Sequence, residues 1–389
     1  MATKRRSVLG LLATAPVAAG ALLSAPAAAS AAVPSDLGPG GSFDRYIARR
    51  AAAGEFTGTV LLAHKGKAVL RRSHGMADVA RGLPNGPDTI FALASVGKVM
   101  TAVAAVQLVQ QGSLALQEKV GTYLDGLPAE LADGATVHDL LTHRSGLGDY
   151  TRTEAYQQEL TRWTSAAEVM SGITAIIKGM PLAYPPGSRS AYSNSGYHLL
   201  GEIIAAVSGT SYHDHVRRHV LSAARMSTSD FYTRPQWRDD DRIAHPYGNG
   251  PDGSPADLVD GKIFVGTPGY NVFASAPDLV RFSRALAGEK LLNRAYTALA
   301  LSGKTASTWS DSPEVAPMPV FGGYGPMNAI VGGHRVLLHN GGAPGQWTFL
   351  EIYPDLDVVT VVLSNRDGAA VSPIVDFARR ILTGSRPGH

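Results

Sequence analysis

Strand-forming segments lie near both ends of this 389-residue chain, and helix-forming segments fill its middle. Rich in Val, Leu and Thr or alternating in polarity, the predicted strands are residues 57–63, 68–70, 335–339, 348–353 and 358–363. The short polar stretches 64–67 and 354–357 have the length and composition of hairpin turns. The most economical fold is one antiparallel sheet built from both ends of the chain and covered by helices, with a helical region inserted.

Helical patterns account for most of the remaining chain. The predicted helices are residues 43–53, 95–111, 136–142, 165–178, 195–207, 211–221 and 373–382. Helix 95–111 is expected to be buried on nearly all sides, because only Thr101 and Gln107 are polar between Val99 and Val109. Residues 234–261, rich in Pro, Gly and Asp, predict a long loop. The sequence thus predicts an α/β (α+β) sandwich with a sheet domain of residues 40–86 plus 262–385 and a helical domain of residues 87–261.

Composition excludes several classes of protein. The chain has no Cys, which excludes a disulfide scaffold, a thiolate nucleophile and Cys-ligated metal sites. The net charge of +3 belongs to the N-terminal segment, because outside residues 1–32 there are 32 basic and 32 acidic residues. No basic surface for nucleic acid is therefore expected. Neither a metal nor a cofactor is expected.

The N-terminal segment has the features of an export signal. Lys4-Arg5-Arg6 precedes an Ala-rich, mildly apolar stretch, and residues 27–32 are small, as at a cleavage site. The adjacent arginines resemble a twin-arginine signal. A membrane anchor is the alternative, disfavoured by Gly10, Pro16 and Gly20 within the stretch. Residues 1–32 are expected to direct secretion, with no stable membrane insertion after their removal.

Ser95-Val-Gly-Lys98 at the start of the buried helix is the first candidate for chemistry. Residues three apart lie on one face of a helix, and the helix N-terminus favours developing negative charge. Burial lowers the pKa of a lysine, and a partly neutral amine accepts a proton from a serine hydroxyl. The alternative is a helix-capping Ser beside a surface Lys.

Two further motifs supply groups that such a serine needs. Tyr192-Ser-Asn194 precedes an apolar helix; a tyrosine beside a cationic Lys relays protons, and an Asn holds a substrate amide or the Lys. A capping turn is the alternative. A second Tyr-x-Asn, at residues 247–249, lies in the predicted loop and has no helix after it.

His339-Asn-Gly341-Gly342 ends a strand, where a backbone N–H could complete an oxyanion hole with that of Ser95. Alone, His-x-Gly is a weak signal.

In order and with their flanks, these motifs resemble those of the serine hydrolases of the penicillin-binding-protein and class C β-lactamase family. That family carries S-x-x-K, then Y-x-N, then K-T-G or H-x-G. The flanks that agree are residues 91–95, 140–146, 192–197 and 339–345, and the resemblance covers residues 40–385. It implies a β-lactamase/transpeptidase-like fold with the site at the junction of sheet and helices.

The resemblance also implies a role for each residue. Ser95 would be the nucleophile, Lys98 its activating partner and Tyr192 the acid/base that serves the leaving group. Asn194, His339, Gly341 and Gly342 would bind substrate, with His339 placing a donor on the Tyr192 side and the N–H groups of Ser95 and Gly342 forming the oxyanion hole. The expected function is an exported, D-alanyl-D-alanine carboxypeptidase-like hydrolase of small-molecule or cell-wall peptide, β-lactam or ester substrates.

Two departures from the family pattern keep other functions open. Asn340 stands where Thr is usual, and residues 325–333 contain no Arg or Lys. Both weaken the case for binding a substrate carboxylate. They favour a class C β-lactamase-like carboxylesterase or a broad D-amino-acid hydrolase. A non-catalytic penicillin-binding-like protein is a further alternative, although such a protein is expected to have lost motif residues.

Overall fold

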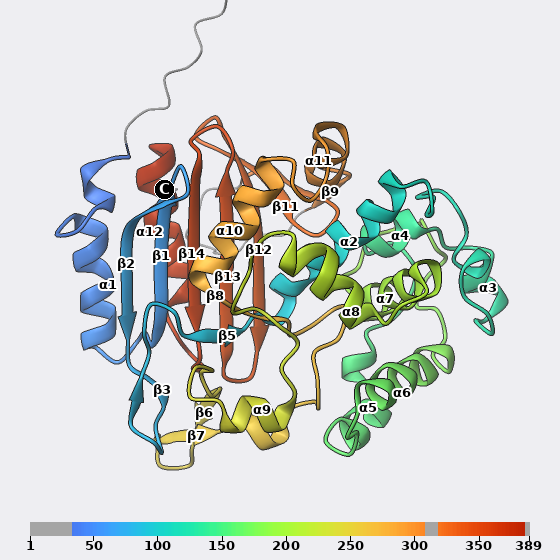
Figure 1. The fold of residues 1–389 in the computed structure, drawn as a ribbon, viewed down its shortest axis with the longest axis horizontal. Coiled ribbons are helices and arrows are strands. Elements are labelled where there is room, and N and C mark those ends of the chain that lie inside the picture. The colour runs from blue at the N-terminus through green and yellow to red at the C-terminus, as the bar shows by residue number, and fades with distance from the viewer. Residues whose placement is uncertain (1–32, 308–317, 386–389) are drawn as a thin grey trace, which may run out of the picture. The chain divides into compact units, whose positions relative to one another are not determined.

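The sheet is formed by eight antiparallel strands in the computed structural model, which describes residues 33–307 and 318–385 (Figure 1). In spatial order they are β2 (Lys67–His74), β1 (Gly58–His64), β14 (Val358–Ser364), β13 (Gln346–Tyr353), β12 (His334–Ala343), β11 (Met327–Val331), β10 (Val320–Gly322) and β9 (Thr305–Ser307). Strands β1 and β14 pair from Gly58 opposite Ser364 to His64 opposite Val358. The predicted sheet built from both chain ends is confirmed.

Helices cover both faces of the sheet. In Figure 1, α10 (Ala276–Ala287) crosses the face toward the viewer and α12 (Val371–Thr383) lies behind the strands, next to α1 (Ser42–Ala52). Strand β14 is buried throughout, and its side chains alternate between two cores: Val361 faces the core that includes α10, and Val362 the core of α1 and α12. A strand buried on both faces explains why residues 358–363 are apolar except for Thr360.

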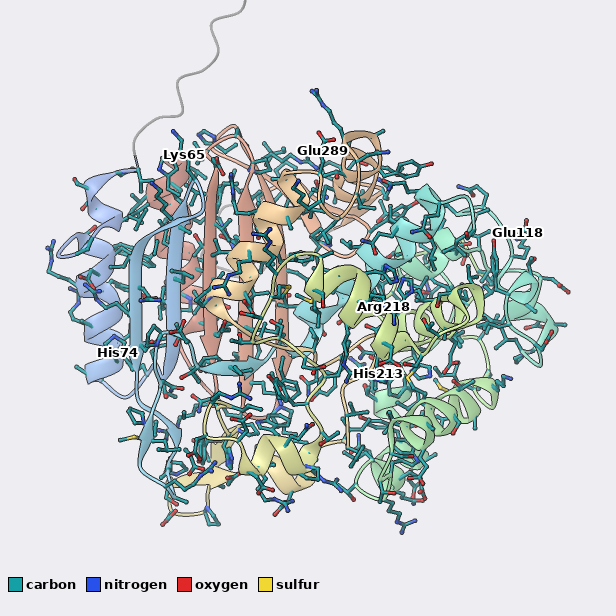
Figure 2. All side chains as sticks on the ribbon, in the orientation of Figure 1. Lys65, His74, Glu118, His213, Arg218 and Glu289 are labelled. Atoms are coloured by element: carbon teal, nitrogen blue, oxygen red, sulfur yellow. The ribbon has the colours of Figure 1, made fainter. Side chains whose placement is uncertain are left out.

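The inserted region is helical, as expected. It contains α2 (Lys98–Gln110), α3 (Ala129–Ala132), α4 (Val137–Leu141), α5 (Glu154–Glu159), α6 (Ala166–Lys178), α7 (Asn194–Ser208) and α8 (Tyr212–Val216), and α11 (Arg294–Leu301) follows α10. Glu118, after α2, and His213, in α8, mark this region in Figure 2. One hydrophobic core runs from Val361 in the sheet through Val103 in α2 to Leu200 in α7. The division into two domains stays a prediction.

Three sequence-based boundaries differ from the structure. The helix expected from residue 95 begins with a 3-10 turn, Ala94–Gly97, before α2. The helix expected at 211–221 is α8 followed by a π-turn at Arg217–Ser222. The expected loop 234–261 contains α9 (Arg234–Asp239), β6 (Tyr247–Asn249) and β7 (Pro255–Asp257). Buried Trp237, whose indole N–H donates to Ala244 O, anchors α9 through a tertiary contact that composition does not reveal.

The other short strands pair outside the eight-stranded sheet. They are β3 (Met76–Asp78), β4 (Leu83–Pro84), β5 (Ile90–Ala92) and β8 (Phe273–Ser275), paired as β3–β4 and β5–β8. The expected export signal, residues 1–32, lies outside the described residues. Within the described part of the chain, the helices are all too short or too polar to span a bilayer.

Candidate active site

Ser95 lies in a strained turn between β5 and α2. Ala94, the residue before it, has φ +45°, a left-handed conformation that is unfavourable for a residue with a Cβ atom. Asn271 stabilises this turn from both sides: its Oδ1 accepts the Ala94 N–H at 3.0 Å and its N–H donates to Ala94 O at 3.1 Å. In a 3-10 turn, side chains three apart are eclipsed. Ser95 and Lys98 therefore point the same way, although they do not lie on one α-helix as expected.

Lys98 is completely buried beside Ser95. Its Nζ lies 3.2 Å from Ser95 Oγ, 2.6 Å from Asn194 Oδ1 and 2.5 Å from the carbonyl oxygen of Gly269. The amide and carbonyl oxygens only accept hydrogen bonds, so they fix two N–H groups of the amine. The third position of the amine faces Ser95 Oγ, where a protonated amine donates and a neutral amine accepts.

Tyr192 lies on the other side of Ser95 Oγ. Its phenol O–H donates to that oxygen at 2.6 Å, and Lys98 Nζ lies 4.8 Å from the centre of its ring. More than half of the Tyr192 surface is exposed, so the phenol stands at the mouth of the site. The structure thus brings Ser95, Lys98 and Tyr192 into hydrogen-bond contact, within reach for proton transfer.

Asp149 orients the Asn194 amide and was not singled out by the sequence. Asn194 begins α7, and its Nδ2 donates to Asp149 Oδ2 at 2.9 Å. This bond turns Asn194 Oδ1 toward Lys98. Asp149 Oδ1 also accepts the Thr151 N–H, which caps a short 3-10 turn. No local pattern connects residue 149 with residue 194, so only the tertiary structure reveals this pair.

His143 supports the segment that carries Tyr192. Its ring centre lies 4.7 Å from that of Tyr192, its carbonyl oxygen accepts the Ala191 N–H at 2.9 Å, and its Nδ1 accepts the Ser193 N–H at 3.3 Å. Burial, together with the positive charge of Lys98, lowers the pKa of His143 to about 3. The ring is therefore neutral at pH 7 with its proton on Nε2. In the sequence, His143 is visible only as part of the segment 140–146, one of the flanks that agree with the family pattern.

His339 on β12 is also neutral. Burial, and then the charge of Lys98, lowers its pKa to about 4. Its Nδ1 lies 2.7 Å from Asn340 O, and since a carbonyl only accepts, Nδ1 carries the proton and Nε2 keeps a lone pair. The sequence-based expectation of a donor on the Tyr192 side stays a prediction; in the neutral ring the one N–H is directed to Asn340 O.

Glycines on β12 allow the strand to approach the nucleophile. A Cβ atom on Gly341 would lie 2.4 Å from Leu93 O and 2.9 Å from the Ser95 backbone nitrogen, closer than any side chain permits. A Cβ atom on Gly342 would touch the indole of Trp347 at 3.3 Å. The absence of a side chain at Gly341 therefore allows β12 to lie against the Ser95 turn. The oxyanion hole expected from the N–H groups of Ser95 and Gly342 stays a prediction.

Ser95 and Tyr192 open into a cleft with a volume of about 630 Å³. Six residues that define its walls are Ser95, His143, Tyr192, His339, Asn340 and Trp347. Lys98 and Asn194 lie beneath this surface, within the buried hydrogen-bond network. The second Tyr-x-Asn lies apart from it in β6, where the Tyr247 phenol accepts the Val79 N–H. A nucleophilic serine with two proton-transfer partners in a small-molecule-sized cleft is suited to acyl transfer.

Comparison with known proteins identifies the family. The family model described as Beta-lactamase matches residues 43–385. The chain is 29% identical over 329 residues to Penicillin-binding protein 4 of Amycolatopsis lactamdurans, covering 81% of this chain and 80% of that protein. It is 31% identical over 218 residues to Esterase EstB of Burkholderia gladioli, covering 54% of this chain and 53% of that protein.

A solved structure agrees with these sequence matches. The crystal structure of a penicillin binding protein from Bacillus halodurans superposes with a TM-score of 0.75 at 25% identity, covering 85% of this chain and 98% of that one. The chain belongs to the beta-lactamase family of serine hydrolases. This confirms both the resemblance and the fold class expected from the sequence.

Removing the Asp149 carboxylate is expected to slow the chemistry at Ser95 without unfolding the protein. In Asp149→Ala, the Asn194 amide loses the acceptor that turns its oxygen toward Lys98. Losing a hydrogen bond to a charged group costs about 1.5–3 kcal/mol, so the rate of Ser95 modification should fall roughly 10- to 100-fold. The rate is measured with a fluorophosphonate and the melting temperature by calorimetry. Thr153→Ala, which removes a cap in the same segment, is the control and should leave the rate unchanged.

Stability is expected to fall in acid because of His339. Its pKa is about 4 in the folded chain and near 6.5 in the unfolded chain. Between these values the unfolded state binds the extra proton, so acidification lowers the free energy of unfolding, by up to about 3 kcal/mol from this group. His339→Gln should therefore lose less stability than wild type between about pH 7.5 and about pH 4.5 in denaturant titrations.

His245 provides a control, because its pKa is shifted in the opposite direction from that of His339. Burial lowers its pKa, but the attraction of Asp257 and Asp78 outweighs burial and raises the value above 6.5. Its contribution to stability therefore grows as the pH falls through the raised value. His245→Gln should lose more stability on acidification than wild type. Equal slopes for wild type and both variants would contradict this assignment of protonation states.

Proposed function

We propose that the protein is a hydrolase that forms an acyl-enzyme on Ser95. The observation that carries the proposal is the convergence on Ser95 Oγ of the Lys98 amine at 3.2 Å and the Tyr192 phenol at 2.6 Å. A serine hydroxyl is a weak nucleophile at neutral pH and needs such a partner to accept its proton. Membership of a family of serine hydrolases supports the same role.

In the proposed reaction, Ser95 Oγ attacks the substrate carbonyl while Lys98 as a neutral amine, or Tyr192 as a phenolate, takes the hydroxyl proton. The negative charge on the carbonyl oxygen is stabilised by the N–H groups of Ser95 and Gly342. The bond to the leaving group then breaks, and the leaving group takes a proton from Tyr192. Where Lys98 took the first proton, it passes that proton on to Tyr192. Water then attacks the ester on Ser95 and gives a proton to the same pair of groups, and the pair passes a proton to Ser95 Oγ as the acid leaves.

The substrates we propose are small molecules or cell-wall peptides with a peptide, β-lactam or ester bond. The name of one relative points to penicillin binding and that of another to ester hydrolysis. Peptide, β-lactam and ester hydrolysis use the same acyl-enzyme chemistry. The carboxylesterase alternative is supported by the esterase relative. It is also supported by the lining of the cleft, whose described residues include no Lys, Arg, Asp or Glu.

Labelling with a fluorophosphonate tests the acyl-transfer chemistry. Wild-type protein should be labelled, Ser95→Ala should lose all labelling, and intact mass should show one adduct per chain. Ser188→Ala is the matched control and should label normally, because this serine lies in the same loop as Tyr192 but its hydroxyl bonds to Pro185 O. Labelling of Ser95→Ala at the wild-type rate, or of neither protein, would favour a non-catalytic binding protein instead.

We further propose that the protein acts outside the cytoplasm, exported through the twin-arginine pathway. The support is the sequence of residues 1–32, where paired arginines precede a weakly apolar, Ala-rich stretch and a run of small residues. Expression of the full chain should yield an extracytoplasmic protein that begins near residue 33. Changing Arg5 and Arg6 to Lys should retain it inside, whereas export of that variant at the normal level would contradict the pathway.

A further inference from the structure

The cleft at Ser95 is walled by uncharged side chains. Every described residue that lines it is Gly, Ala, Ser, Thr, Asn, Met, Tyr, Trp or a histidine. The two histidines are neutral at pH 7, since burial lowers the pKa of His143 to about 3 and that of His339 to about 4. Lys98 is fully buried, and its Nζ is bonded to three protein oxygens.

Basic side chains beside the cleft in sequence are directed to other partners. Lys304 precedes the wall residue Thr305, but its Nζ donates to Leu299 O at 2.6 Å. Arg335 lies on the same strand as His339, but its guanidinium donates to Asn328 Oδ1 at 2.9 and 3.2 Å. Residues 308–317, outside the described ranges, contain no Lys or Arg in the sequence.

The helical side of the cleft is similar. Arg144 follows the wall residue His143, and its guanidinium donates to Gly187 O. Arg189 lies in the Tyr192 loop, and its guanidinium lies 4.4 Å from the ring centre of Tyr184. Among the described residues that line the cleft there is no Arg or Lys, so a carboxylate bound against these walls would lose water without gaining a charged partner there, which is unfavourable.

Two aromatic rings offer an apolar surface in the same cleft. Tyr192 is 53% exposed and Trp347 is 38% exposed, and both line the cavity. Because Gly342 has no side chain, the Trp347 indole lies directly against the strand backbone beside the nucleophile turn. Apolar atoms of a substrate placed on these rings would be removed from water, with a gain of about 25 cal/mol per Å².

From these contacts we infer that the cleft takes uncharged carboxylic esters and amides that bear an apolar group, and that it rejects substrates with a carboxylate near the scissile bond. β-Lactams and peptides with a free C-terminal residue belong to the rejected class. The inference rests on the proposed acyl-enzyme function and names its substrate class.

Matched substrates that differ only in charge test this selectivity. One pair is p-nitrophenyl 4-carbamoylbutanoate and the p-nitrophenyl monoester of glutaric acid, in which a carboxylate replaces the carboxamide; a second is an N-acyl-D-Ala-D-Ala peptide and its C-terminal amide. For every pair in which hydrolysis is detected, kcat/KM of the uncharged substrate should exceed that of the carboxylate by at least about 10-fold, equivalent to about 1.4 kcal/mol. Equal or reversed preference would overturn the inference.

The failure of this inference is distinguishable from failure of the proposed function. If a fluorophosphonate labels Ser95 but all four substrates are refused, or the carboxylates are preferred, the substrate class is wrong and the acyl-enzyme proposal stands. If Ser95 is not labelled, the acyl-enzyme proposal itself fails.

A charge introduced into the wall provides a gain-of-function test. His339→Lys places an ammonium where the neutral imidazole lies, and His339→Gln is the uncharged control. The ratio of kcat/KM for the carboxylate ester to that for the neutral ester should rise about 10-fold in His339→Lys relative to His339→Gln. Turnover of the neutral ester by each variant serves as the internal reference for folding. An unchanged ratio would show that charge at the wall does not determine the selectivity.

Discussion

The buried amine of Lys98 is the interaction on which the site depends. An ammonium group removed from water is costly unless oxygens surround it, and here the oxygens come from the Ser95 turn, the start of α7 and the loop at Gly269. These segments are far apart in the sequence. The need to satisfy one buried nitrogen therefore draws the nucleophile turn, the helical region and the Gly269 loop together.

The close approach of β12 to the Ser95 turn is the second constraint. Gly341 is the residue that permits it, because a Cβ atom there would overlap Leu93 O. The sheet, assembled from both chain ends, thus supplies one wall of the cleft, and the helices supply the other. The same burial that holds Lys98 in place keeps His143 and His339 uncharged, so the architecture of the site and the neutrality of its walls have one cause.

The sequence predicted the sheet and the central residues because their signals are local. Apolar runs such as 358–363 and the three-residue spacing of Ser95 and Lys98 are visible without a structure. Asp149 and His143 were missed, since their partners lie about 45–50 positions along the chain. The left-handed φ of Ala94 and the protonation states of the histidines were also beyond reach, because each depends on how distant segments pack.

Rapid-quench acylation followed by peptide mass mapping tests the central claim most directly. Wild-type protein and Lys98→Met are mixed with an uncharged activated ester and stopped within the first turnover. The account predicts an acyl group on the peptide that contains Ser95 in the wild type, and a rate of its formation lower by at least about 100-fold in the variant. An adduct on another residue, or equal rates in the two proteins, would contradict it.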